Sequence, residues 1–460
     1  MKIRFFSTLL GLAALSGCVV GPNYQKPAVA VPVKHRGADE SGASMADKPW
    51  REVFRDPVLR DLIDEGLRNN TDLVQATYRI EQAAAGAGAA QSEFFPWLDG
   101  SASAARTKMS EPMPGVDPRV NQFSLKGSLS WELDLWGRIR RSNEAARARL
   151  VGTEYGRATV QTGLVASVAS AYADLRTYDR QLEIARSTLE SRRKSLGLVQ
   201  ERAKQGVSSD LEVGQAEVLL RQAEVRVPQT EQAIAITEDL ICVLLGRHPG
   251  PVARGRTLES FDGSLRLKAG LPSHLLETRP DILSAEQDLV AANAEIGVAK
   301  AAYFPALRLT GSDGFVSGQL EDLFKGPAHT WSFAPTLAGP IFNAGRIHFS
   351  VKSAEAEQKR LVAAYQGTIQ QAFREAADSI ITYDKAGQVV DRQMALVSSL
   401  ERVASLAATR YQGGASSYLE VLDAERNLFD GQLALTEARR TRLKAVVQAY
   451  RALGGGWDRK

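Results

Sequence analysis

Long stretches of the chain repeat apolar and small residues at intervals of three and four positions, which is the spacing of an α-helix. No proline occurs between positions 139 and 205, or between 345 and 411. A helix of about 65 residues would be about 100 Å long. Two further helices of about 35 residues are predicted over 208–246 and 416–454, and Pro228 should bend the first or mark a junction between stacked helices.

The apolar positions of these helices are often alanine, valine and glycine rather than a sustained leucine heptad. A coiled-coil hairpin, the simplest explanation of such long helices, would show one apolar seam. Two shallow contact faces on each helix instead favour a closed cylinder, in which every helix has a neighbour on both sides.

Alternation of apolar with small or polar residues predicts four strands between the helices. They cover 98–107 and 121–135, then 306–316 and 330–342, and each pair flanks a loop containing Gly and Pro. Aromatic residues near them are typical of membrane-interface girdles, although plain core aromatics are the alternative. These residues are Trp97, Trp131, Trp136, Phe304, Trp331, Phe333 and Phe342.

Four strands cannot close a transmembrane barrel. Strands of about ten residues span a bilayer when tilted, but open sheet edges leave backbone groups that lipid cannot satisfy. The smallest transmembrane barrels have about eight strands. The chain should therefore oligomerise, and two copies or three copies would both satisfy this argument.

The chain also contains an internal duplication. Residues 202–217 and 410–425 are identical at nine of sixteen positions, at an offset of 208. Other short matches keep nearly the same offset, such as Gly137-Arg138-Ile139 with Gly345-Arg346-Ile347. Such regularity indicates that one half-chain was duplicated and that both halves fold alike.

Composition excludes several classes of protein. The net charge of +4 on 460 residues is close to balanced, and no basic block indicates nucleic-acid binding. The two cysteines are Cys18, in a processing signal, and Cys242, in an apolar helical run where a buried small hydrophobe is expected. No disulfide framework is possible in the mature chain.

Enzyme chemistry is also not indicated. The sequence has no Gly-rich phosphate loop, no HExxH motif and no paired cysteines for zinc, so no catalytic or metal-binding residue is predicted. Five scattered histidines lack ligand spacing and are expected at the surface or in interfaces: 35, 248, 274, 329 and 348.

The N-terminus has the organisation of a secretion signal. Lys2 and Arg4 precede an apolar stretch over 5–15, and Leu15-Ser16-Gly17-Cys18 then resembles a bacterial lipoprotein box. This resemblance implies cleavage before Cys18 and attachment of diacylglycerol and an N-acyl chain such as palmitate to it. Val19 implies sorting to the outer membrane. An ordinary signal with a coincidental cysteine is the alternative.

The mature chain is similar throughout to the TolC-like outer-membrane efflux factors, and most to their OprM/NodT-type lipoprotein branch. The motifs that carry the resemblance are LSGCVVGPNY, SWELDLWGRIR, LPSHLLETRPDI, AEQDLVAANAEIGVAKAAYFP, PIFNAGR, YLEVLDAER and YRALGGGW. It implies a homotrimer in which a 12-helix α-barrel in the periplasm joins a 12-stranded transmembrane β-barrel in the outer membrane.

The same resemblance implies the exit duct of a tripartite pump that exports drugs or other small toxic compounds and confers multidrug resistance. Its partners would be a periplasmic adaptor (membrane fusion) protein and an inner-membrane RND-type transporter. A secretion duct for protein or other cargo, or a coiled-coil lipoprotein without a channel, remains the alternative. Five methionines without a cluster give no support to copper export.

The expected organisation of the chain follows from these patterns. It comprises a signal peptide (1–17), a lipidated extended arm (18–48), equatorial and first α-barrel helices (49–97), a first barrel hairpin (98–135), periplasmic helices (136–304), a second barrel hairpin (305–342), further periplasmic helices (343–456) and a C-terminal tail (457–460).

A candidate gate lies just after the Gly413-Gly414 turn. Leu419 and Asp423 are four positions apart and share one helical face, and Arg426 follows three positions later. The resemblance places a tight aperture here, with rings of Leu419 and Asp423. An ordinary surface pair between Asp423 and Arg426 is the alternative.

Three more residues belong to this expectation. The resemblance matches Arg410, Tyr411 and Arg426 to positions that hold the closed tip through hydrogen bonds and ion pairs. Asp210, which aligns with Tyr418 in the duplicated sequence, would add an acidic position to the gate.

Overall fold

The computed structural model describes residues 19–37, 44–108, 110, 119–261, 267 and 270–457. Its contacts divide the chain into two compact units. The strand-bearing unit comprises Met1–Ala28, Arg79–Glu154 and Ser284–Tyr365, and the helical unit comprises Val29–Tyr78, Tyr155–Leu283 and Gln366–Lys460. Each unit takes segments from both halves of the duplicated sequence.

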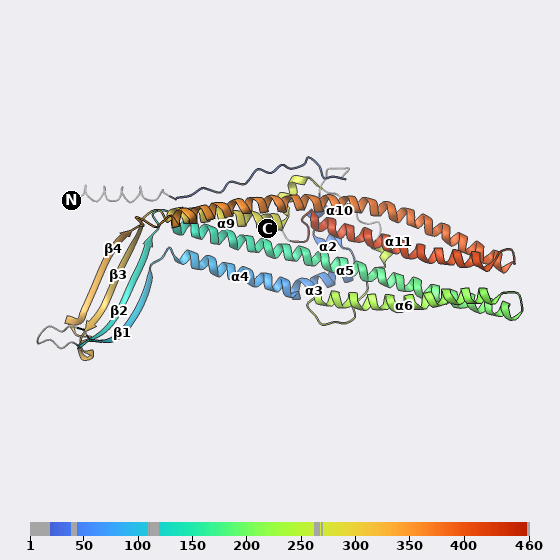
Figure 1. Ribbon diagram of the computed structural model, residues 1–460, viewed down its shortest axis with the longest axis horizontal. Coiled ribbons are helices and arrows are strands. Elements are labelled where there is room, and N and C mark those ends of the chain that lie inside the picture. The colour runs from blue at the N-terminus through green and yellow to red at the C-terminus, as the bar shows by residue number, and fades with distance from the viewer. Residues whose placement is uncertain are drawn as a thin grey trace. The chain divides into compact units, whose positions relative to one another are not determined.

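Four antiparallel strands form one sheet in the described part of the strand-bearing unit, in the order β1-β2-β3-β4 (Figure 1). They are β1 (Trp97–Lys108), β2 (Arg119–Leu133), β3 (Ala306–Ser317) and β4 (His329–Ala338). The central pair joins the two halves of the duplication, with Leu129 of β2 opposite Leu98 of β1 and Gly311 of β3. Within the described residues, β1 and β4 each have a strand partner on one side only.

Two strands end earlier than their alternation predicts. β4 ends at Ala338 instead of 342, and Gly339 and Pro340 follow it outside the sheet. β2 ends at Leu133 instead of 135, because Asp134 leaves the sheet to cap the next helix. Its carboxylate accepts the backbone N–H groups of Ile139 at 3.0 Å and Arg140 at 2.9 Å.

The strand aromatics divide into two groups. Trp97, Trp331 and Phe333 are about two-thirds exposed, at 59%, 70% and 64%. Trp136 is different, because its ring stacks on Phe304 at 4.7 Å and its Nε1 donates to a backbone carbonyl at 2.8 Å. The sheet therefore presents bare aromatic side chains that the chain itself does not cover.

The long helices have nearly the predicted bounds. The helices of 67 residues are α5 (Arg138–Lys204) and α10 (Arg346–Gln412), and those of 35 residues are α6 (Asp210–Leu244) and α11 (Tyr418–Ala452). Pro228 lies inside α6, which continues through it, so the expected alternative of a junction between stacked helices is wrong. The missing N–H of one proline costs a hydrogen bond without ending the helix.

The remaining helices are shorter. They are α2 (Trp50–Val53), α3 (Pro57–Asn69), α4 (Thr71–Ser92), α7 (Leu258–Phe261), α8 (Leu275–Thr278) and α9 (Pro280–Ala301), with 3-10 turns η2 (Met45–Asp47), η3 (Pro272–His274), η4 (Leu320–Asp322) and η5 (Gly326–Ala328). Among the described helices, none combines the length and apolar character needed to cross a membrane.

The N-terminal arm is extended and held by specific contacts. In the strand-bearing unit, Val20 N donates to the Trp136 carbonyl at 3.0 Å, and Asn293 Nδ2 donates to the Pro22 carbonyl at 2.9 Å. Gly21 has a φ of +104°, and a Cβ there would lie 2.5 Å from the backbone of Gly297. Only glycine fits this approach.

One expectation about the histidines is wrong. His35 is 3% exposed and buried in the helical unit, and its Nε2 has no hydrogen-bond partner. Burial lowers the pKa of His35. Two residues later the chain approaches α10, since a Cβ on Gly37 would lie 2.8 Å from Cγ1 of Ile381. Cys242 is buried as predicted, and its thiol donates to the Gly250 carbonyl at 3.2 Å.

The core of the helical unit is organised around the buried carboxylate of Asp56, which is 1% exposed. It caps α3 through Val58 N at 2.9 Å, and it also accepts Arg256 N at 2.7 Å and the Tyr172 hydroxyl at 3.2 Å. Burial, to which the neighbouring carboxylate adds, raises the pKa of Tyr172 to about 12. A Cβ on Gly255 would lie 2.2 Å from this carboxylate. One side chain thus joins α3, α5 and the loop after α6.

Replacing Asp56 with alanine should destabilise the protein by about 2–4 kcal/mol, because one helix cap and two further buried donors lose their acceptor. Thermal unfolding of the detergent-solubilised protein measures this. Asp61→Ala, at an exposed position of the same helix, should change stability by less than about 0.5 kcal/mol. Equal effects of the two substitutions would contradict the role assigned to Asp56.

Candidate functional site at the helical turns

Two turns of the same design connect the long helices at one end of the helical unit (Figure 1). Gly206 and Gly414 both have a φ of +72°. Val207 N donates to the Arg202 carbonyl at 2.9 Å, and Ala415 N donates to the Arg410 carbonyl at 2.8 Å. Glycine ends helices in this left-handed conformation without steric cost. The duplicated sequence therefore produces a duplicated turn.

The two turns differ in how the following helix is capped. Ser209 accepts Glu212 N at 3.3 Å, and the Glu212 carboxylate accepts Ser209 N at 3.0 Å, which is a complete capping box. Ser417, at the equivalent position before α11, makes no such side-chain hydrogen bond. Instead, Arg410 Nη2 donates across the turn to the Ala415 carbonyl at 3.2 Å. The start of α11 is thus held less tightly than the start of α6.

Two tyrosines form the centre of a small apolar core behind the turns. Tyr411 and Tyr418 are 5% and 2% exposed, and their ring centroids lie 5.1 Å apart. The Arg202 guanidinium lies 4.6 Å from the Tyr411 ring centroid, a cation–π contact. Ser208 Oγ and Tyr411 Oη are 3.3 Å apart. Burial raises the pKa of Tyr418, and the Glu425 carboxylate adds to this.

The face of α11 opposite this core carries three of the predicted residues. Leu419 is 61% exposed. The side chains of Asp423 and Arg426 are 56% and 58% exposed, with Arg426 Nη2 at 2.5 Å from Asp423 Oδ1. Asn427 Nδ2 also donates to Asp423, at 3.1 Å. An exposed ion pair of this kind contributes only ~0–1 kcal/mol to the free energy of unfolding, so a stabilising role alone does not explain the Asp423–Arg426 pair.

The other predicted residues are distributed differently. Tyr411 is buried, so it contacts the interior and the first turn but not the exposed face of α11. Arg410 is exposed and binds its own turn. Asp210 is the exposed first residue of α6, where a carboxylate suits the helix N-terminus. Leu419, Asp423 and Arg426 are the residues that share one exposed face.

The periodicity of the sequence does not predict a set of polar side chains that lies between α5, α6 and α11. Arg192 is 3% exposed, and its Nη1 donates to the Leu219 carbonyl at 2.7 Å. Ser195 Oγ donates to Glu425 Oε1 at 3.4 Å. Comparing the duplicated halves would have pointed to it, since the residue equivalent to Arg192 is Leu400.

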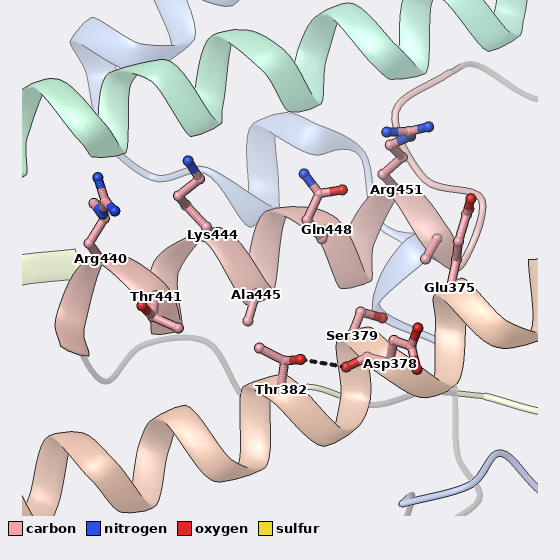
Figure 2. Close-up of a pocket in the computed structure, with 11 residues that line it drawn as sticks. Glu375, Asp378, Ser379, Thr382, Arg440, Thr441, Lys444, Ala445, Gln448 and Arg451 are labelled. Atoms are coloured by element: carbon pink, nitrogen blue, oxygen red, sulfur yellow. Dashed lines mark hydrogen bonds between the residues drawn. The ribbon is translucent and has the colours of Figure 1, made fainter. Parts of the chain in front are cut away.

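A separate cavity of about 500 Å³ lies between α10 and α11 in the helical unit. Figure 2 shows Thr382 of α10 facing Ala445 of α11 across it. Lys444 Nζ lies 2.9 Å from an Asp174 carboxylate oxygen, and Arg440 Nη1 lies 3.7 Å from the same carboxylate. The wall also carries Glu375, Asp378 and Arg451, so it presents charged side chains of both signs. Across the described residues, no cluster of three or more His, Cys, Asp or Glu side chains is placed to hold a metal ion.

Comparisons with known proteins cover nearly the whole chain. A family model described as "Outer membrane efflux protein" matches residues 62–247 and 271–455. The solvent efflux pump outer membrane protein SrpC of Pseudomonas putida is 38% identical over 460 residues, covering 98% of each chain. The cation efflux system protein CusC of Escherichia coli is 34% identical over 450 residues, covering 97% of each chain. The crystal structure of the Campylobacter jejuni CmeC outer membrane channel has a TM-score of 0.90 at 26% identity, covering 96% of each chain.

Substituting Tyr411 tests whether its packing or its hydroxyl matters more. Tyr411→Ala should remove about 3–5 kcal/mol of local stability by opening a cavity, whereas Tyr411→Phe should cost about 1 kcal/mol or less. Hydrogen exchange of the backbone amides in residues 413–417 measures this local opening. Tyr78→Ala, at a position that is 63% exposed, serves as the control. Faster exchange in the Phe variant than in the Ala variant would contradict the packing role.

Proposed function

Since the chain belongs to the outer membrane efflux protein family, and is thus an outer-membrane efflux channel rather than an enzyme, we propose that the exposed face of α11 forms its gate. The face consists of Leu419, Asp423 and Arg426. The opposite face of the same helical turns is packed, with Val421 and Ala424 both buried. This contrast carries the proposal, because these turns of α11 are anchored on one side and leave a leucine and a charged pair exposed on the other.

The mainly helical, duplicated fold with an antiparallel sheet is confirmed, and we propose that three copies complete it. Within the described residues, β1 and β4 each have a free edge. An edge exposed to lipid leaves backbone groups unsatisfied. Pairing β4 of one copy with β1 of the next would give three copies a closed sheet of twelve strands. A homotrimer would also bring three copies of the α11 face around one axis.

The gate would act through charge and size. Three Asp423 carboxylates near a common axis would repel one another, attract cations and disfavour anions. Three Leu419 side chains one helical turn away would narrow the same passage. Because the exposed Asp423–Arg426 pair is weak, a partner that binds one state more tightly can shift the equilibrium between closed and open.

That partner would be a periplasmic adaptor (membrane fusion) protein, which in turn would connect the channel to an inner-membrane RND-type transporter. The relatives are named for solvent efflux and for cation efflux. For this chain we propose drugs and other small toxic compounds as the exported material, delivered through the periplasm and across the outer membrane.

We also propose that the protein is anchored by lipid. Cys18 lies outside the described residues. Two residues after it, Val20 N donates to the Trp136 carbonyl at 3.0 Å in the strand-bearing unit. Acyl chains on Cys18 would add membrane affinity of ~0.8 kcal/mol per buried CH₂.

Replacing Asp423 and Arg426 together with alanine should raise the single-channel conductance in planar bilayers by at least about two-fold, because the narrow charged ring is lost. Glu190→Ala with Lys194→Ala removes another exposed pair, on α5, whose side chains are 54% and 76% exposed. This control should conduct like the parent. An unchanged conductance in the Asp423/Arg426 variant would remove the gate from this site.

Substitution of Cys18 tests the lipid anchor. Cys18→Ala should abolish incorporation of radiolabelled palmitate, because the acylated thiol and the new N-terminus are lost together. Cys242→Ala removes the only other cysteine and should leave labelling intact. Labelling that persists in the Cys18 variant would show that the acyl chains are attached elsewhere or that the signal is of the ordinary type.

A further inference from the structure

Arg192 is a buried cation that neither the turns nor the exposed face of α11 accounts for. It lies on α5, about three helical turns before the helix ends. Its Nη1 donates to the Leu219 carbonyl of α6 at 2.7 Å, and its guanidinium lies 5.1 Å from the ring centroid of Phe429 of α11. Its Nε has no hydrogen-bond partner. One side chain therefore connects three helices at the cost of an incompletely satisfied buried charge.

The opposite charge comes from α11. Glu425 is half-buried, and its Oε1 accepts Ser195 Oγ at 3.4 Å. Burial raises the pKa of Glu425, and the positive charge of Arg192 acts in the opposite direction. Burial lowers the pKa of Arg192, and Glu425 and Asp430 oppose that shift. Each group therefore opposes the effect of burial on the other's pKa, while the direct contact of Arg192 with α11 is the one to the Phe429 ring.

The duplication shows that this arrangement is particular to one boundary. At the offset of 208, Leu400 takes the place of Arg192, and Arg221 takes the place of Phe429. Leu400 instead packs against α11, where a Cβ on Gly431 would lie 2.7 Å from its Cδ1. Arg221 is on the surface of α6 and pairs with the carboxylate of Glu224 at 2.8 Å. The second half of the chain therefore fills the equivalent space with an apolar side chain.

Arg192 contacts α11 at Phe429, three residues after Arg426 of the exposed face. Glu425 lies between Asp423 and Arg426 in the sequence, so a single turn of α11 presents the exposed pair on one side and the half-buried carboxylate on the other. A displacement of α11 away from α5 would take Phe429 off the Arg192 guanidinium and break the hydrogen bond between Ser195 and Glu425. A buried cation that loses such a contact is left less well compensated.

We propose that Arg192 is a positioning residue of the gate, which holds α11 against α5 and α6 and thereby keeps Leu419, Asp423 and Arg426 in the closed arrangement. This inference rests on the gate proposed above. Opening then requires that the adaptor supply enough binding free energy to move α11 away from the Arg192 guanidinium. Arg192 thus sets the free energy needed to open the gate, and the exposed face of α11 sets the width and charge of the passage.

The test is made on the full-length channel in planar bilayers. Arg192 is replaced with leucine, because leucine occupies the equivalent position, 400, in the second half of the chain. Arg192→Leu should raise the single-channel conductance or the open probability by at least about two-fold. Arg192→Lys keeps the charge without the planar fork, and its effect should lie between those of the parent and the Leu variant. Arg193→Leu is the matched control, since the adjacent side chain is 59% exposed and should leave conduction unchanged.

A second substitution distinguishes positioning from general loss of structure. In Arg192→Leu the half-buried carboxylate of Glu425 loses the nearby positive charge that opposes the effect of burial on its pKa. Adding Glu425→Gln should therefore return the conductance toward the parent value, whereas a merely damaged fold would be damaged further. Thermal unfolding of each variant is measured in parallel. If Arg192→Leu does not assemble, Arg192→Lys alone decides, and conduction identical to the parent would overturn the inference.

The outcomes separate the two proposals. If Asp423→Ala with Arg426→Ala raises conductance and the Arg192 variants do not, the gate stands and the role of Arg192 is wrong. If neither set raises conductance, the gate is wrong and the inference about Arg192 is wrong with it. Raised conductance in both sets, with reversal by Glu425→Gln, supports both proposals.

Discussion

The backbone of the outer strands is the constraint on which the rest of this molecule depends. In the described residues, β1 and β4 each carry one row of N–H and C=O groups without a strand partner, and aromatic side chains such as Trp331 are exposed beside them. In lipid, such groups must be paired with other protein. A chain that brings two hairpins cannot meet this requirement alone. The proposed trimer answers it, and a channel with a shared axis follows from the same requirement.

The duplication gives both halves of the chain helices and turns of the same length, and the two halves differ in a few capping and charged residues near the candidate gate. α5 and α10 both have 67 residues, α6 and α11 both have 35, and both turns use a glycine with a φ of +72°. However, Ser209 completes a capping box before α6, whereas Ser417 does not do so before α11. The same helix, α11, carries the exposed Asp423 and faces the buried Arg192. The guanidinium of Arg192 thus lies between α6, to which it donates a hydrogen bond, and the more loosely capped α11.

The candidate site was only partly predictable from residue spacing. Leu419, Asp423 and Arg426 share a face because helical geometry places residues three and four apart together, and the structure exposes all three. The position of Tyr411 could not be predicted in this way, because its burial depends on Tyr418 across the turn and on Arg202 of the other half. The importance of Arg192 was also not visible, since its contacts to α6 and α11 join residues far apart in the chain.

The sequence by itself determined the lengths of the helices, the positions of the turns, the existence of four strands and the twofold repetition. These features depend on backbone preferences and on periodicity, which neighbouring residues set locally. Only the tertiary structure decided which polar and charged side chains are buried, as for Arg192, His35 and Asp56. It also decided that β2 ends early, because Asp134 turns to cap α5. The physical reason is that burial and hydrogen bonding depend on partners that the fold, and not the local sequence, brings together.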